Sequence, residues 1–437
     1  MIKRLLIVGA FTGIGHLTNI LILKYLSINI PKETISIIGE IDSLVILIVS
    51  IISFGLQLSA TRKIAILDDW KEEYYSTQSA RFTLSLFLIV VGLSGFLITK
   101  NVLFLFSPIF GLNGDYALYA RGKPKLGAFV SMLRVIIPAM ALFLASIYWN
   151  EYLVTIYGLT ILGAYILAGL IVSSSLQVDY FVKPNVKNLK KYWIHLGLGI
   201  ASVLFLFIGI SLINIVSLIY TTSIVAIIYL ILKFYMIFKG IRQIIVQSFY
   251  KELIEEKIAF KVDQIASITG LVFFISLGFF LNVMAPVFFS EEFINYHSTF
   301  FLIGLAGFVS SFTTSTGARL LLLSKDKEYT RNIILAAGIT IISSIVFYYV
   351  FGNKLSLIAL SILIGELVLS GLNTFSVKEN NFLIKRIKAI LPFVLISLLF
   401  LLINYLYEES MITYITFLIT IGASVIFFSK KKLTTTE

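Results

Sequence analysis

Residues 194–238, IHLGLGIASVLFLFIGISLINIVSLIYTTSIVAIIYLILKFYMIF, decide the class of fold, because this whole stretch contains a single charged side chain, Lys233. A helix needs about 20 apolar residues to cross the hydrocarbon core of a bilayer, so the stretch is long enough for two crossings. Its apolar residues are continuous and do not alternate with polar ones, which excludes the strands of a transmembrane barrel. The stretch therefore predicts an all-α integral membrane protein.

The composition of the whole chain supports this prediction. Of its 437 residues, 58% are hydrophobic and 13% are charged, whereas ordinary globular domains are about 25% charged. No cysteine is present, which excludes disulfides and thiolate metal sites, and the three histidines (His16, His195 and His297) lack metal-ligand spacing. We attribute the net charge of +12 to cytoplasmic loops and not to a nucleic-acid partner.

Outward from residues 194–238, the apolar segments predict about fourteen transmembrane helices. They lie near residues 5–28, 35–60, 82–100, 102–120, 126–148, 152–177, 194–214, 216–238, 265–289, 298–323, 331–351, 355–376, 388–407 and 411–429. The pairs that meet at Asn101 and at Ile215 can each be one bent helix. The first segment is expected to be a retained span and not a cleaved signal peptide, since it lacks a small-x-small cleavage site.

The loops between these segments predict the orientation. Most of the 35 lysines and arginines fall in alternate loops, including Arg81, Lys239 and Arg386. Loops rich in Lys and Arg stay in the cytoplasm, so both termini are expected to be cytoplasmic. The external connections are short, which leaves no room for a soluble catalytic domain.

An internal repeat predicts how the spans are grouped. The basic loops 118–125 and 321–328 are each followed by two spans, which are broken at 149–151 and at 352–354. A long charged linker, able to form an amphipathic surface helix, follows the second span of each half. We therefore expect two parallel six-helix repeats and an extra C-terminal helix pair. The predicted domains are an N-terminal six-helix lobe (1–182), a C-terminal six-helix lobe (183–376), and an extra transmembrane helix pair with a cytoplasmic tail (377–437). Transporters commonly bind substrate between such halves.

Polar residues inside the first span are the first candidates for a substrate site. An ionisable group at this depth costs about 2.5–3.5 kcal/mol, so it usually faces a cavity or a partner. Thr12, His16 and Asn19 share one face of the first span, and Lys24 lies nearby. This face either lines a cavity and binds sugar or phosphate, or holds helices together while Lys24 reaches the membrane surface.

Arg134 is the sharpest candidate for binding an anionic substrate. It lies in the middle of a span and shares a face with Ser131. A guanidinium group in this position can bind a pyrophosphate through two parallel hydrogen bonds. The alternative is a buried ion pair with Asp115 or with Glu366.

Three polar residues of span 355–376, Glu366, Ser370 and Asn373, share one face of the predicted helix. They either coordinate a coupling proton or Na⁺, or neutralise a buried arginine. Asp115 is the second candidate for ion coupling, and its alternative is a local pair with Arg121. Glu40 and Asp42 lie near the outer end of their span, where contact with water is expected.

Near the predicted cytoplasmic mouth, Arg242 and Arg319 can attract an anionic head group, or they are ordinary positive charges of cytoplasmic loops. The stretch 310–316, SSFTTST, is rich in hydroxyl groups. It indicates either the wall of a wet lumen or close helix packing, and packing is the favoured interpretation.

Three local sequences suggest a family: Gln57-Leu-Ser-Ala-Thr-Arg-Lys-Ile-Ala, Ala120-Arg-Gly-Lys-Pro124 and Ala285-Pro-Val-Phe-Phe-Ser-Glu-Glu-Phe293. Together with the two six-span halves, they resemble the multidrug/oligosaccharidyl-lipid/polysaccharide exporter superfamily. Within it, the chain is most similar to O-antigen and polysaccharide flippases of the Wzx kind. The resemblance covers roughly residues 1–376, and the extra pair 388–429 is similar to fourteen-span members.

The resemblance implies a cargo, an undecaprenyl-pyrophosphate-linked oligosaccharide that is a repeat unit of O-antigen, lipopolysaccharide or another polysaccharide. A flippase would turn it by alternating access from the cytoplasmic to the outer leaflet of the bacterial plasma (inner) membrane. A polar, often cationic cavity would hold the head group. The expected partners are this substrate, membrane lipids and the polysaccharide assembly machinery, with no nucleic acid. No cofactor is expected beyond a coupling H⁺ or Na⁺.

Two other functions stay open. An ion-coupled multidrug antiporter of the same superfamily would favour acidic cavity groups, whereas Arg134, His16 and Lys24 favour anions. A membrane polymerase or ligase for polysaccharide is expected to carry a large outer loop with arginines and histidines, which this chain lacks. The sequence contains no Walker A, Gly-x-Ser-x-Gly or His-Glu-x-x-His motif. We therefore do not expect an enzyme.

Overall fold

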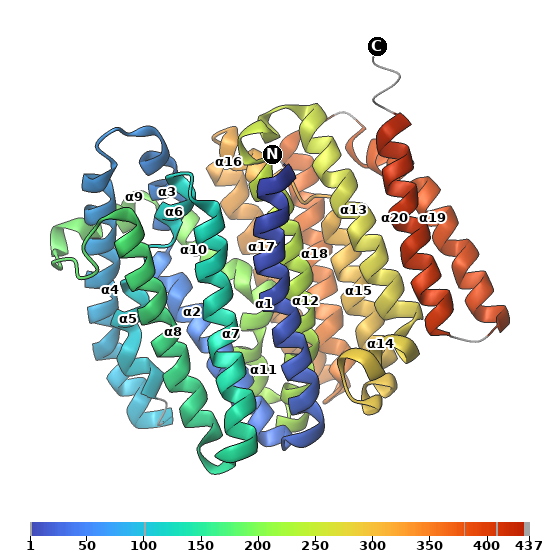
Figure 1. Ribbon diagram of the computed structural model, residues 1–437, viewed down its shortest axis with the longest axis horizontal. Helices are drawn as coiled ribbons and strands as arrows, with labels where there is room; N and C mark the ends of the chain where they lie inside the picture. Colours follow the sequence, from blue (N-terminus) through green and yellow to red (C-terminus); the bar gives the residue numbers. More distant parts are fainter. Residues whose placement is uncertain (1, 100–101, 380, 408–409, 432–437) are drawn as a thin grey trace. The chain divides into compact units, whose positions relative to one another are not determined.

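The computed structural model describes residues 2–99, 102–379, 381–407 and 410–431, and over these ranges the chain forms helices and no strand (Figure 1). Its contacts divide it into two compact units, Met1–Lys233 (unit 1) and Phe234–Glu437 (unit 2). The boundary falls inside one long helix, α12 (Thr222–Ser248). The three predicted domains, 1–182, 183–376 and 377–437, stay a prediction.

The prediction of an all-α integral membrane protein is confirmed. In the described ranges, ten helices are long and apolar enough to cross a membrane, or eleven if the bent pair Val186–Ile194 and Leu196–Ile208 is one span. Of the other expected spans, 5–28 and 411–429 are the helices α1 (Ile2–Asn29) and α20 (Met411–Lys431). With 28 residues, α1 extends for about 42 Å, enough for a crossing.

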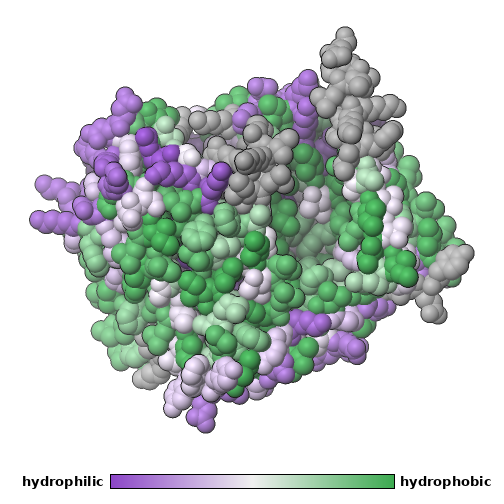
Figure 2. Space-filling model, in the orientation of Figure 1, coloured by the Kyte–Doolittle hydropathy of each residue, from purple (hydrophilic) through white to green (hydrophobic). Residues whose placement is uncertain are grey.

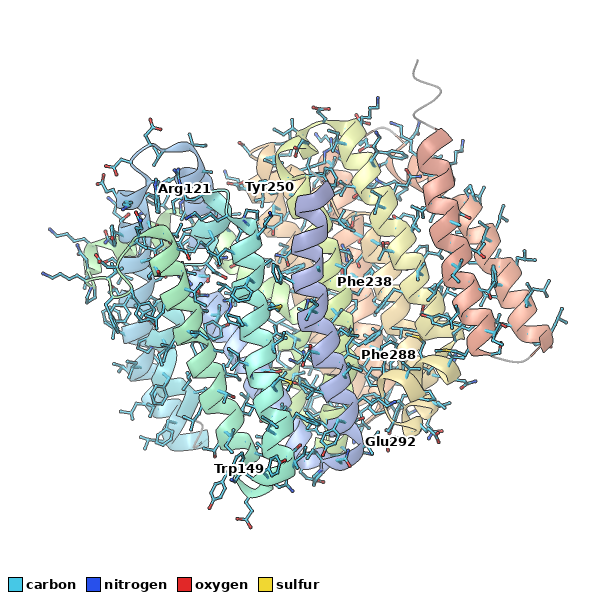
Figure 3. All side chains as sticks on the ribbon, viewed as in Figure 1. Arg121, Trp149, Phe238, Tyr250, Phe288 and Glu292 are labelled. Carbon is cyan, nitrogen blue, oxygen red and sulfur yellow. The ribbon has the colours of Figure 1, made fainter. Side chains whose placement is uncertain are left out.

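Unit 1 contains α1 and the elements up to the first half of α12. These are α2 (Lys32–Ser53), α3 (Leu56–Ile66), α4 (Trp70–Thr99), η1 (Val102–Phe106), α5 (Ser107–Gly111), α6 (Tyr116–Ala120), α7 (Pro124–Tyr148), η2 (Asn150–Tyr152), α8 (Leu153–Leu176), η3 (Val186–Leu189), α9 (Lys190–Ile194), α10 (Leu196–Phe205), η4 (Leu206–Ile208), η5 (Ile210–Leu212) and α11 (Ile213–Ile219). The helix α7 packs between α1 and α8. In Figure 3, Arg121, three residues before α7, and Trp149, directly after α7, lie at opposite ends of this helix.

Unit 2 contains the second half of α12 and the rest of the chain. Its elements are η6 (Tyr250–Ile254), α13 (Glu256–Phe279), α14 (Leu281–Phe288), η7 (Glu291–Tyr296), α15 (His297–Ser311), α16 (Thr316–Leu322), α17 (Asp326–Phe351), α18 (Leu355–Val377), α19 (Phe382–Tyr407) and α20. The helices α13, α15, α18 and α17 pack side by side in this order, and α19 packs on α13 and α20. Figure 3 labels Tyr250 and Glu292 at opposite ends of this unit.

The expected span 102–120 is not a continuous helix, because it is divided into η1, α5 and α6. The expected break at Asn101 lies outside the described residues. Two side chains of α4 bind the backbone that the interruption frees: Gln78 donates to the carbonyl of Leu112 (3.1 Å) and Arg81 to that of Asn113 (2.7 Å). Carbonyls exposed at membrane depth require such donors. Arg81, expected in a loop, is therefore a buried part of α4 and only 1% exposed.

The two charged linkers differ from each other. In unit 1 the expected span 35–60 is divided, because α2 ends at Ser53. After a left-handed turn at Phe54–Gly55, the separate amphipathic helix α3 buries Leu56, Ala60 and Ile64. In unit 2 the helix α12 continues to Ser248, so the start of the second linker is part of the span itself. The boundary expected at Ile215 is also wrong, because α11 ends at Ile219 and α12 begins at Thr222.

The surface has the pattern of a multi-pass membrane protein. Figure 2 shows hydrophobic side chains over the flanks of the helices and hydrophilic side chains near the helix ends. Large apolar side chains such as Val90, Leu170, Ile342 and Leu395 are exposed along the spans. Lipid can cover such side chains directly, so no further partner is needed to explain them.

Candidate substrate and ion sites at membrane depth

Asp42 of α2 is the centre of a buried polar cluster in unit 1. It accepts hydrogen bonds from the hydroxyls of Tyr157 (2.5 Å) and Tyr229 (2.6 Å), and it forms an ion pair with Lys233. Tyr229 and Lys233 can share one carboxylate because residues four apart lie on the same face of a helix. The expectation that Asp42 faces water is wrong, since it is only 7% exposed, whereas its neighbour Glu40 is exposed. Neither tyrosine is conspicuous in the sequence, because each lies within an apolar segment.

The predicted polar face of α1 lies partly beside this cluster. His16 is half-buried, and the charge of Lys233 acts on it. Asn19 and Lys24 are also half-buried, and the side chain of Thr12 lies outside what the structure describes. Lys233 of α12 therefore pairs with Asp42 of α2 and also interacts through its charge with His16 of α1.

Arg134 of α7 forms an ion pair with Asp115, the residue that precedes α6. Its Nη2 lies 2.5 Å from Oδ2 of Asp115 and 3.1 Å from Oγ of Ser131, and its guanidinium carbon lies 5.3 Å from the ring centre of Tyr165. Of the alternatives for this arginine, the structure shows the pair with Asp115. The guanidinium carbon of Arg121 instead lies 5.1 Å from the ring centre of Trp70, so Arg121 is not the partner of Asp115.

Glu366 of α18 belongs to a second tyrosine–lysine–carboxylate cluster, in unit 2. It accepts a hydrogen bond from the hydroxyl of Tyr235 (2.7 Å) and forms an ion pair with Lys239 (2.8 Å). The side chain of Glu366 is only 3% exposed. Lys239, expected in a loop, is inside α12 and lies four residues after Tyr235.

The two polar residues that share the face of Glu366 join helices. The hydroxyl of Thr313 donates to Ser370 (3.0 Å), and the amide of Asn332 donates to Asn373 (3.0 Å). These bonds connect α18 to α17 and to the segment between α15 and α16. This face of α18 is thus largely used for helix packing.

Arg242 of α12 binds the end of α15. Its guanidinium group donates to the carbonyl of Ser310 (2.6 Å), to the hydroxyl of Ser310 (2.5 Å) and to the hydroxyl of Thr314 (2.9 Å). The SSFTTST stretch is where the span breaks, because α15 ends at Ser311 and α16 begins at Thr316. The last carbonyls of a helix have no partner within the helix, and a cation is favourable there. Most hydroxyls of the stretch are buried, as expected for close packing.

A network of four buried charges lies where α13, α16 and α19 meet. Arg386 donates to Asp263 (2.7 Å) and Glu379 (2.9 Å), and Arg319 donates to Glu379 (3.0 Å). Asp263 also accepts hydrogen bonds from the backbone and hydroxyl of Ser315, at the start of α16. Burial raises the pKa of Glu379, but its hydrogen bonds and charge interactions with Arg386 and Arg319 outweigh this, so the pKa lies below its ordinary value.

Three cations at membrane depth are each paired with a carboxylate, and this pairing is the main electrostatic feature of the site. No group of three His, Asp or Glu residues in the described ranges is placed to hold a metal ion. Lys233, Arg134 and Lys239 each hold a carboxylate at membrane depth. An anionic ligand can bind such a cation by replacing the carboxylate, which must then find another partner or take up a proton.

No family model and no curated protein matches the sequence. Solved structures match the fold. The lipid II flippase MurJ in an inward closed conformation is 14% identical, with a TM-score of 0.68 over 99% of this chain and 100% of that one. An inward-facing multidrug resistance MATE transporter of the MOP superfamily is 15% identical, with a TM-score of 0.59 over 88% of this chain and 98% of that one.

A third match is a MOP superfamily transporter from Pyrococcus furiosus, which is 14% identical with a TM-score of 0.51 over 89% of this chain and 94% of that one. MOP is the multidrug/oligosaccharidyl-lipid/polysaccharide exporter superfamily that the sequence resembles. The chain has the fold of these transporters. At such low identity the likeness concerns the fold alone.

Proposed function

We propose that the protein is a flippase for an anionic lipid-linked oligosaccharide. The observation that carries this proposal is Lys233, a cation in the middle of an apolar helix that is paired with the carboxylate of Asp42. A pyrophosphate that replaces Asp42 would gain a charge-assisted hydrogen bond in a low dielectric. The MOP fold, with MurJ among its members, supports the same class of function.

Arg134 is the second substrate-binding residue of the proposal, with Asp115 as the carboxylate that it would release. His16, Asn19 and Lys24 of α1 complete the proposed polar face. Arg242 and Arg319 are proposed to attract the head group, in addition to their observed bonds to Ser310, Thr314 and Glu379. Glu366 and Asp115 are the proposed sites for coupling to H⁺ or Na⁺.

We further place the protein in a bacterial inner membrane with both termini in the cytoplasm. The orientation is supported by the basic residues at one end of unit 1, among them Arg121, Lys183 and Lys187, which are all exposed. Under the positive-inside rule this end faces the cytoplasm. The proposed cargo would then enter from the cytoplasmic leaflet and leave in the outer leaflet, next to the polysaccharide assembly machinery.

The test uses a host strain in which the gene and any other flippase for the same polymer are inactivated. The strain is complemented with the wild type, Arg134→Ala, Lys233→Met or the matched control Arg331→Ala, an exposed arginine of α17. We expect the wild type and Arg331→Ala to restore surface polysaccharide. Arg134→Ala and Lys233→Met should trap the lipid-linked repeat unit in the inner leaflet even when the result is normalised to the amount of folded protein in the membrane, because each also leaves a carboxylate without its cation.

The second candidate function is an ion-coupled multidrug antiporter, which the buried carboxylates of Asp42 and Glu366 favour, since they can bind a cation if their lysines are released. Efflux of a cationic dye from cells that express the protein distinguishes the two. Dye efflux without restored surface polysaccharide contradicts the flippase and supports the antiporter. Restored polysaccharide without efflux supports the flippase.

A further inference from the structure

A sharp bend in unit 1 turns the chain across the end of a membrane span. The helical segment Val186–Ile194 makes an angle of 77° with the segment Leu196–Ile208 that follows it. If the second segment runs along the membrane normal, the first lies nearly parallel to the membrane surface. We call residues 181–195 the elbow; it belongs to the connection between α8 and α10 in Figure 1.

The elbow is held firmly by side chains on its inner side. The hydroxyl of Tyr192 donates to the carbonyl of Ile52 (2.5 Å), at the end of α2, and the tyrosine is buried. Lys191 forms an ion pair with Glu73 of α4 (2.9 Å). These contacts fix which side of the elbow faces outward, so its exposed residues do not result from a loosely attached loop.

The outer side combines large apolar side chains with lysines. Trp193 is 74% exposed and Phe181 is 72% exposed, and Val186 and Ile194 are also exposed. Lys183, Lys187 and Lys190 are exposed between them. The elbow contains four lysines and no acidic residue, and only Lys191 is neutralised by an ion pair with a carboxylate of unit 1.

We propose that the elbow binds the anionic phospholipid head groups of the leaflet in which α10 begins. Three observations on the elbow select this partner. The segment turns by 77° from the helix that follows it, its exposed aromatic rings suit the boundary between head groups and acyl chains, and its lysines match the negative charge of the lipids. The stems of the lysines can cover apolar surface while their ammonium groups reach the phosphates. This proposal does not depend on the nature of the cargo.

The depth of Trp193 in the bilayer tests whether the elbow lies at the lipid head groups. The protein has three tryptophans, so Trp70→Phe with Trp149→Phe leaves Trp193 as the only one. The full chain is reconstituted into equimolar phosphatidylcholine and phosphatidylglycerol, with bromine atoms placed near the head group or in the middle of the acyl chain. We expect blue-shifted emission that the shallow bromines quench most strongly. Emission typical of water, with no quenching by either lipid, would overturn the proposal.

Substitution of the elbow lysines tests whether the elbow prefers anionic lipids. In the elbow variant Lys183, Lys187 and Lys190 are changed to Gln, and in a matched control the exposed Lys327, Lys378 and Lys388 of unit 2 are changed to Gln. Binding of spin-labelled phosphatidylglycerol to the purified protein is measured against spin-labelled phosphatidylcholine. Each elbow lysine should contribute about a fivefold preference for the anionic lipid.

We expect this preference to fall in the elbow variant more than in the control. An equal loss in both variants would show that total charge, and not the elbow, attracts the lipid, and would contradict the proposal. The emission of Trp193 also distinguishes binding of a soluble protein from binding of lipid. If it is in contact with water in vesicles and is shielded only after cytosolic protein is added, the elbow binds a protein and the proposal is wrong.

Discussion

Lys233 and Lys239 have equivalent surroundings on α12, because each follows a tyrosine by four residues and shares one carboxylate with it. Lys233 and Tyr229 hold Asp42, and Lys239 and Tyr235 hold Glu366. Six residues correspond to about 240° around a helix, so the two lysines point to different faces. A single helix thus carries two cations at membrane depth, and each is neutralised by an acid from another helix.

Lys239→Met should lower the free energy of unfolding by about 3–5 kcal/mol, because the carboxylate of Glu366 would stay buried without its cation. Glu366→Gln should destabilise the protein for the reciprocal reason. The double variant should lose less than the sum of the single losses, because neither charge is then left unpaired. Denaturant or thermal unfolding in detergent micelles measures this. Additive losses would show that the pair contributes no coupling energy. Lys327→Met, at an exposed lysine, is the control.

Gly39→Ala should disturb the Asp42 cluster without removing any of its polar groups. A Cβ atom at this position would lie 2.7 Å from Cγ of Tyr229, so the ring would have to move away. We expect a loss of about 1–3 kcal/mol in stability, as for other overpacked cores. Gly163→Ala in α8 is the control, since its Cβ would meet no atom within 4 Å. It should be neutral or stabilise the helix by up to about 1 kcal/mol. Equal thermal stability of both variants would contradict the predicted clash.

Arg81→Met should destabilise the broken span of unit 1. The substitution keeps an apolar stem but removes the donor to the buried carbonyl of Asn113, which costs about 1–3 kcal/mol for an unsatisfied group. The protected amides of residues 112–120 should also exchange faster with deuterium. Arg331→Met, at an exposed position, should change neither quantity. Unchanged exchange in Arg81→Met would mean that other contacts hold the segment.

The network of Arg386, Asp263, Glu379 and Arg319 in unit 2 should make the free energy of unfolding depend on pH in the acidic range. The pKa of Glu379 is lowered from its ordinary value of 4.5 by Arg386 and Arg319, against the effect of burial. A carboxylate whose pKa is lower in the folded state stabilises the protein above the pKa of the unfolded state, and this contribution is lost as the pH falls through the folded pKa. The stability difference between the wild type and Glu379→Gln should therefore be constant from neutral pH to about pH 5 and shrink below about pH 4.5.

Unfolding midpoints of both proteins, measured in the same detergent at several pH values, test this prediction. Glu256→Gln provides the control, because the side chain of Glu256 is 54% exposed and its pair with Lys385 is at the surface. Its difference from the wild type should be small at every pH. A difference for Glu379→Gln that grows on acidification would contradict the sign of the pKa shift.

Hydropathy predicts most spans correctly, because a run of apolar residues can be stable only in a helix that crosses the bilayer or is buried. The same pattern misplaces Arg81, Lys239 and Arg386, which were expected in loops. A charged residue at the edge of an apolar run can belong to a loop or to the next turns of the helix. Only a partner carboxylate or carbonyl decides between these positions, and such partners come from distant parts of the sequence.

The candidate site was predictable only in part. Arg134 and Glu366 are conspicuous in the sequence because each is a charge inside an apolar segment, and the sequence also offers Asp115 as a partner for Arg134. The cluster around Asp42 was missed, since Tyr157 and Tyr229 lie 115 and 187 residues away from it and tyrosines are common in membrane helices. Helical spacing could have linked Tyr229 to Lys233, but not either of them to Asp42.

The pair formed by Asp263 and Arg386 has a consequence for the synthesis of the protein. The two residues are 123 positions apart, and Arg386 is on the penultimate helix. At about 5–20 residues per second, a ribosome makes the arginine roughly 6–25 s after the aspartate. During this time α13 has no counterion from α19, so the interior of unit 2 cannot be completed. A nascent chain stopped after α18 would hold the carboxylate of Asp263 without the cation that pairs with it in the complete unit.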